Sequence, residues 1–316
     1  MKNKKLIYCL LVTFFAFILY SSHIQHIENA RIKVIEPKTN KVTKKQQKEP
    51  KITTSSAPSY KPKNSLTDNS NVKIEKGSKK SLVNAIEKAM GTKGSYQVSV
   101  QDLNNSSKYA RVATDSKSHN VNAAMKLYLL TALYKQEQSG KIKAGSSIKI
   151  TKSDRAKGET YLTTNMMYSI PYLRDAMLAR NNKTAANALL RKVGAKNVNN
   201  IAAKFGAKDT AIVGTFTKTP VGRTTANDLD MVLKGLYQGR VLNRQHAQTV
   251  LMAMHGHSNP LISEINGTIY SVGDKYCAAA IVQNTGHSYC ISVWSESGQN
   301  LTKLGKSVNK WFNQNH

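Results

Sequence analysis

Lys126 is the residue of this chain whose type and setting first suggest chemistry. It lies in the segment 121–140, where leucines recur at helical spacing and no proline intervenes. The segment is therefore predicted to form one helix, with Asn120 as its N-cap and Gly140 just past its end. An ammonium beside a buried helix face needs a reason, because lysine is rarely buried unpaired. Either the stem of Lys126 carries the charge out to solvent, or the amine belongs to a functional site.

The tetrad Ala123-Ala124-Met125-Lys126 resembles the S-x-x-K motif of the serine β-lactamase and penicillin-binding-protein family. In that family a nucleophilic serine lies three residues before the lysine. This spacing puts both side chains on one face of a helix, so the amine can take the hydroxyl proton. Here the lysine is present, but the nucleophile position is Ala123, and a methyl group cannot attack an acyl carbon. The resemblance implies that Lys126 is the remnant of a catalytic pair.

A second stretch, Met177–Leu190, is similar to the family pattern M-x-x-x-S-D-N-x-A-A-N-x-L-L. Its structural half fits, whereas S-D-N is replaced by Asn181-Asn182-Lys183. The family's serine passes a proton to the leaving group, which an amide cannot do. The resemblance implies that Asn181, Asn182 and Lys183 line a cleft. The alternative is that the two asparagines only begin a helix.

The third family motif, K-T-G on the strand beside the site, aligns with Ser271-Val272-Gly273 and lacks its lysine. Ser271 and Gly273 are then expected to line the cleft. Shifting the alignment makes Lys275 the candidate, without a hydroxyl or a glycine after it. In addition, the loop 214–225 contains no Asp or Glu, although the β-lactamases carry there a glutamate that activates the deacylating water.

Other candidate groups carry less weight. Ser146-Ser147-Ile148-Lys149 matches S-x-x-K literally but lies in a predicted extended segment, where residues three apart point to opposite faces. His255-Gly256-His257 resembles half of a metal site, yet no carboxylate or cysteine lies near it in the sequence, so neither a metal nor a cofactor is expected. Cys277 and Cys290 lie on neighbouring predicted strands, and either a disulfide or two buried free thiols is compatible with that placement.

The order of the predicted elements indicates an α+β fold. Two strands, 96–103 and 109–114, precede a block of helices, and three strands, 268–272, 277–283 and 289–295, precede a last helix, 301–312. This order predicts one five-stranded antiparallel sheet with a helical subdomain inserted between its second and third strands. With the terminal helices on one face and the segment 121–140 on the other, the domain is an α/β/α sandwich, as in the β-lactamase-like family.

The N-terminal 80 residues are predicted to lie outside this fold. Lysines precede the apolar run Leu6–Tyr20, as in a secretory signal or a short membrane anchor, and no small-residue cleavage site follows, which favours an anchor. A polar, lysine-rich linker with four prolines comes next. The predicted organisation is therefore 1–28 anchor, 29–80 disordered basic linker and 81–316 β-lactamase-like domain.

The chain carries 47 Lys+Arg against 18 Asp+Glu, a net charge of +29. Such an excess favours polyanionic surroundings. Because the N-terminus predicts export, the expected partners are peptidoglycan or an anionic cell-wall polymer, and the membrane through the N-terminal segment, with no nucleic acid. No oligomeric state is predicted.

Three functions are compatible with these patterns. The first is a membrane-anchored extracytoplasmic domain of the bacterial envelope that has lost acyl-transfer chemistry and binds a wall peptide, a glycan or a partner. The second is an active β-lactamase or D,D-peptidase with an unconventional nucleophile, which requires a different register at Ala123. The third is a basic wall- or membrane-binding module in which the fold is only a scaffold.

Overall fold

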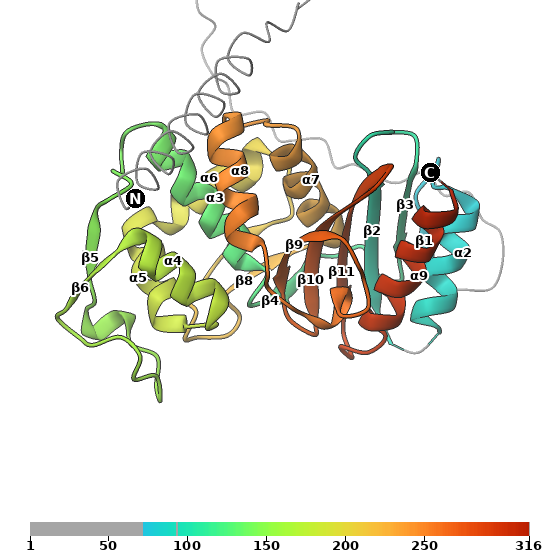
Figure 1. The fold of residues 1–316 in the computed structure, drawn as a ribbon. Coiled ribbons are helices and arrows are strands. Elements are labelled where there is room, and N and C mark those ends of the chain that lie inside the picture. The colour runs from blue at the N-terminus through green and yellow to red at the C-terminus, as the bar shows by residue number, and fades with distance from the viewer. Residues whose placement is uncertain (1–71, 93, 316) are drawn as a thin grey trace, which may run out of the picture. The chain divides into compact units, whose positions relative to one another are not determined.

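The structure is a computed structural model that describes residues 72–92 and 94–315, and the statements below concern those residues. The predicted anchor and most of the predicted linker lie outside them. An antiparallel sheet of six strands in the order β1-β3-β2-β11-β10-β9 runs through the domain (Figure 1). Its strands are β1 Lys73–Ile74, β2 Tyr96–Asp102, β3 Tyr109–Ala113, β9 Thr268–Gly273, β10 Cys277–Asn284 and β11 His287–Ser295.

Five of these strands are the predicted ones, and β2 pairs with β11, so the N- and C-terminal strands lie side by side as expected. The sheet has one strand more than the five predicted, the edge strand β1. Lys73 and Ile74 pair with Ala113 and Val112 of β3, within the range predicted as linker. Two residues are too few to give a periodic signal in the sequence.

Helices cover both faces of the sheet. On one face, α2 (Lys80–Met90) and α9 (Leu301–Gln314) pack against each other and against the strands. On the other face, α7 (Ala226–Tyr237) packs on β2, β10 and β11, whereas α8 (Arg244–Met254) contacts β9. The expectation that the segment 121–140 covers this second face is corrected, because α7 covers most of it and α3 contacts mainly the edge strand β9.

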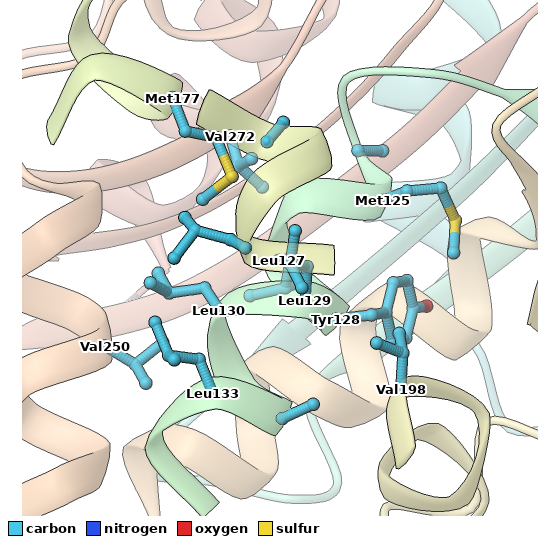
Figure 2. Close-up of a cluster of buried hydrophobic side chains, with 14 of the residues drawn as sticks. Met125, Leu127, Tyr128, Leu129, Leu130, Leu133, Met177, Val198, Val250 and Val272 are labelled. Atoms are coloured by element: carbon cyan, nitrogen blue, oxygen red, sulfur yellow. The ribbon is translucent and has the colours of Figure 1, made fainter. Parts of the chain in front are cut away.

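Helix α3, Met125–Gln138, instead lies inside the helical block. Its residues from 125 to 134 are all buried, and a helix that is buried all round belongs to an interior rather than to a sheet surface. Figure 2 shows the leucines of α3 packed against Met177 and Val250, which come from two other helices. The surrounding helices are α4 Ile170–Ala179, α5 Lys183–Val193, α6 Ala195–Lys204 and α8.

The start of α3 also differs from the prediction. Asn120 is not an N-cap but lies in β4, His119–Val121, which pairs with β8, Gly222–Thr224. Because the partner strand is about a hundred residues away, local sequence could not show this pairing. The remaining elements are β5 Ser147–Lys149, η1 Lys152–Asp154, β6 Met167–Ser169, β7 Ala211–Ile212 and η2 Pro260–Ile262. None of the helices in the described part is long and apolar enough to span a bilayer.

The two cysteines of the sheet are free and buried. In the register of β10 and β11, Cys277 lies opposite Trp294, and Cys290 lies opposite Ile281. The thiols are therefore four positions apart along the hairpin, and the free-thiol alternative is confirmed.

Candidate functional site

Lys126 lies in the first turn of α3, and its side chain is 6% exposed. The strand β4 ends at Val121, shortly before the helix begins at Met125, so the pairing of β4 with β8 anchors the chain close to the point at which the lysine enters the core. Its Nζ donates to the backbone oxygen of Met177 at 2.8 Å and to Oδ1 of Asn181 at 2.5 Å. The charge of Lys126 is thus held inside the protein by two neutral oxygens, rather than carried out to solvent along the stem.

Burial lowers the pKa of Lys126 to about 8, because a low-dielectric environment disfavours the ammonium. The negative charges of Asp274 and Glu159 act in the opposite direction, and the positive charge of Lys183 adds to the lowering. Carboxylates from two distant segments therefore lie within electrostatic range of this amine.

Asn181 and Asn182 lie in the turn between α4 and α5, and Lys183 is the first residue of α5. Asn181 is exposed and has a φ of 51°, a left-handed conformation that asparagine tolerates, and its amide turns towards Lys126. Asn182 is buried and caps α5, with Oδ1 accepting from the backbone N–H of Ala185 at 2.7 Å. For Asn182, the structure therefore shows the role of a helix-start residue.

Glu159 also holds the N-terminus of α5. Its two carboxylate oxygens accept from the backbone N–H groups of Lys183 at 2.7 Å and of Thr184 at 2.9 Å. A carboxylate is favourable there because the first N–H groups of a helix lack intrahelical acceptors. The side chain of Lys183 is exposed.

The end of β9 carries the residues aligned with the third family motif, and Asp274, which follows it, acts electrostatically on Lys126. The Ser271 side chain is fully buried and donates to the backbone oxygen of His257 at 2.6 Å, so its hydroxyl is not presented to a ligand. Gly273 has a φ of 120°, and a Cβ there would lie 2.2 Å from the backbone oxygen of Cys277, so only glycine fits. Asp274 follows, and its Oδ1 accepts from the N–H groups of Tyr276 and Cys277 in the hairpin turn. The alternative candidate, Lys275, is exposed with its Nζ over the Tyr276 ring.

The loop 214–225 is fastened to the same end of α3. The N–H of Phe216 donates to Oδ1 of Asn187 in α5 at 2.7 Å, and the N–H of Val221 donates to Oδ1 of Asn122 at 3.3 Å. Asn122 directly precedes Ala123, which is half-buried. The loop thus borders the start of α3, and it brings neither Asp nor Glu to that place.

The structure therefore brings Lys126 and Asn181 into contact. Lys183 lies near enough for its positive charge to lower the pKa of Lys126. Sequence reasoning missed Glu159 and the role of Asp274. It weighed His257 only as half of a metal site and expected no metal there; in the structure, the pKa of His257 is lowered by burial and by the nearby charge of Lys126. These residues lie between about 30 and 150 positions from Lys126, and no local pattern marks them as its neighbours.

The remaining sequence candidates stay apart from this site. Lys149 lies in β5 and Ser146 directly precedes that strand, so the literal S-x-x-K match is not on a helix. Within residues 72–92 and 94–315, no group of three or more His, Cys, Asp or Glu residues is placed to hold a metal ion.

The chemistry available at this site centres on the amine of Lys126. With a pKa near 8, the amine exists in both protonation states close to neutral pH, so it can accept a proton or donate a hydrogen bond to a bound carbonyl. At position 123, three residues before it, only a methyl group is present.

Known proteins share the sequence pattern and the fold of this chain. The sequence profile of the beta-lactamase enzyme family matches residues 79–312. Among solved structures, PBP-A is similar over 74% of this chain and 96% of its own, with 15% identity and a TM-score of 0.65. The TLA-3 extended-spectrum beta-lactamase covers 73% of this chain and 98% of its own, with 17% identity and a TM-score of 0.64.

A class A beta-lactamase from Bacteroides cellulosilyticus is similar over 78% of this chain and its entire own chain, with 14% identity and a TM-score of 0.64. At these identities the structures support the fold alone. The comparison with curated proteins gives no significant match. Because the family profile spans the whole folded domain from the start of α2 into α9, this chain belongs to the beta-lactamase enzyme family.

Proposed function

We propose that this chain is a membrane-anchored, extracytoplasmic member of the family that binds a peptidoglycan peptide or glycan without acyl transfer. The observation that carries the proposal is the pair of residues at positions 123 and 126. Lys126 is retained, buried and hydrogen-bonded to Asn181, whereas Ala123 offers no hydroxyl to it. Loss of a nucleophile alone lowers the rate of such an enzyme by several orders of magnitude.

The charges around Lys126 support ligand binding in place of catalysis. The family's K-T-G lysine attracts a substrate carboxylate, but here Asp274 follows Gly273, and Glu159 lies at the start of α5. Together with Lys126 and Lys183, these carboxylates give a site with both signs of charge. Such a site suits a wall peptide that carries an amino group as well as a carboxylate.

Covalent labelling tests the proposal. A PBP-A variant has been captured as an acyl-enzyme complex with penicillin-G, so a fluorescent penicillin is a suitable probe for this fold. The full-length chain in neutral detergent is incubated with it beside an active penicillin-binding protein, and both are read by gel fluorescence and intact mass. We expect an adduct only on the active protein. An adduct on this chain, mapped to any side chain near Lys126, would establish the alternative of an active serine hydrolase.

Binding to isolated cell wall separates the first function from the third. We expect the variant Lys126→Ala to bind wall fragments more weakly than the parent chain at moderate salt. Binding that is lost with salt but unchanged by Lys126→Ala would instead indicate a basic wall- or membrane-binding module.

The membrane anchor is the part of the proposal that depends on the N-terminal sequence alone. The lysines before the apolar run Leu6–Tyr20 favour an orientation with the folded domain outside the cell. Protease treatment of intact cells should digest the domain, and its release into the medium would show that the segment is cleaved.

A further inference from the structure

A hollow of about 410 Å³ lies between the C-terminal half of α3 and helix α6. From Lys126 to Gln136 the helix advances ten residues, or about 15 Å, so the hollow lies well away from the candidate site. Three lysines and three side-chain amides contribute to its lining: Lys135, Lys141, Lys204, Gln136, Asn197 and Asn200. The residues that line it include no carboxylate.

The positive charge of this hollow is not balanced by its two helices. Helix α6 contains no Asp or Glu. The single acidic residue of α3 is Glu137, whose Oε1 lies 3.7 Å from Nε2 of His246 in α8. None of the ion pairs in the described part of the chain involves the three lysines of the hollow. Several lysines around one hollow without a counter-charge favour the binding of an anion there.

The frame of the hollow is held in place by hydrogen bonds. The amides of Gln136 and Asn197 both donate to the backbone oxygen of Val193, at 2.8 Å and 2.7 Å, and so connect α3 and α6 to the C-terminal end of α5. Nζ of Lys135 donates to the backbone oxygen of Val241 at 2.5 Å, which leaves two of its protons for a ligand. Lys141 and Lys204 line the hollow and are exposed, so their ammonium groups are accessible to a ligand from solvent.

We propose that this hollow binds a phosphate group of an anionic polymer built from phosphodiesters, such as poly(glycerol phosphate). A phosphate offers several acceptor oxygens, which matches three ammonium groups and nearby amide donors. The site gives the proposed envelope protein a second contact, separate from the site around Lys126. It does not depend on whether that site is catalytic.

The first test measures the thermal melting of the full-length chain in neutral detergent, in sodium phosphate and in sodium chloride of equal ionic strength. We expect a higher melting temperature in phosphate. The double variant Lys141→Gln/Lys204→Gln should lose this difference, while the matched control Lys303→Gln/Lys310→Gln, with two exposed lysines removed from α9, should keep it. Equal melting temperatures in the two salts, or equal loss in both double variants, would overturn the proposal.

The second test measures binding of soluble poly(glycerol phosphate) and, separately, of phosphatidylglycerol vesicles. We expect the soluble polymer to bind, with affinity about tenfold weaker and less dependent on salt in Lys141→Gln/Lys204→Gln than in the control. Binding to the vesicles without binding to the polymer would assign the hollow to lipid headgroups and refute the polymer. Neither result alters the outcome of penicillin labelling, so the two proposals fail independently.

Discussion

The Nζ of Lys126 lies 2.5 Å from Oδ1 of Asn181, and this contact joins the first turn of α3 to the turn between α4 and α5. In the alignment proposed from the sequence, it connects the lysine of S-x-x-K to the first position of S-D-N. The serine of S-x-x-K is Ala123, and the first residue of S-D-N is Asn181. An amide oxygen can stabilise an ammonium by accepting a hydrogen bond from it. Unlike a hydroxyl, it cannot pass a proton on to a leaving group.

The first prediction concerns the charge at position 181. Asn181→Asp places a carboxylate against the ammonium and should raise the pKa of Lys126 well above 8, whereas Asn181→Ala removes an acceptor and should lower it. The pKa is measured by NMR titration of the lysine side-chain carbons. Asn105→Asp, in the exposed turn between β2 and β3, is the control and should leave it unchanged. Shifts of the same sign in both position-181 variants would contradict the contact.

The second prediction tests whether the charge of Asp274 affects the pKa of Lys126. Its charge raises the pKa of Lys126 against the effect of burial, so Asp274→Asn should move that pKa below 8. Glu264→Gln removes a carboxylate that pairs with Lys306 on α9 and should have no effect. An unchanged titration of Lys126 in Asp274→Asn would show that the end of β9 does not contribute to the electrostatics of the site.

The third prediction concerns the pH dependence of stability. Burial raises the pKa of Asp228 to about 6, against roughly 3.9 in an unfolded chain. Between these values the folded state holds the proton more tightly, so the free energy of unfolding should fall as pH rises from about 4 to about 6, by about 3 kcal/mol. Asp228→Asn keeps an oxygen that can accept from the Thr210 hydroxyl, and it should flatten this part of the profile. Urea denaturation at several pH values measures the effect, and identical slopes in the two proteins would refute it.

The fourth prediction concerns the packing of α9. A Cβ at Gly305 would lie 1.8 Å from the backbone oxygen of Leu261, so the helix and η2 would have to move apart. Gly305→Ala should therefore lower the free energy of unfolding by about 2 kcal/mol or more. Gly145→Ala, where a Cβ meets nothing within 4 Å, is the matched control and should change stability little. A Gly305→Ala protein as stable as the control would show that the two elements do not approach this closely.

Much of the fold could be read from local patterns. The strands 96–103 and 277–283 and the last helix, 301–312, were predicted from alternation and from helical spacing, and all three are present as β2, β10 and α9. The errors occur where a long-range contact overrides a local preference. Asn120 is a good cap by type, but its backbone pairs with β8. Most of the sheet face is covered by α7, because residues 125–134 of α3 are buried on every side within the helical block.

The amino-acid sequence by itself determined which reactive groups are present at the aligned motif positions and which are absent. It places a methyl group at position 123, a lysine three residues later and no carboxylate between residues 214 and 225. What only the tertiary structure decided is how the lysine is surrounded: the amide of Asn181, the carboxylates of Glu159 and Asp274, and the burial that brings its pKa to about 8. Such an environment depends on distances across the folded chain, which a linear pattern of residue types does not contain.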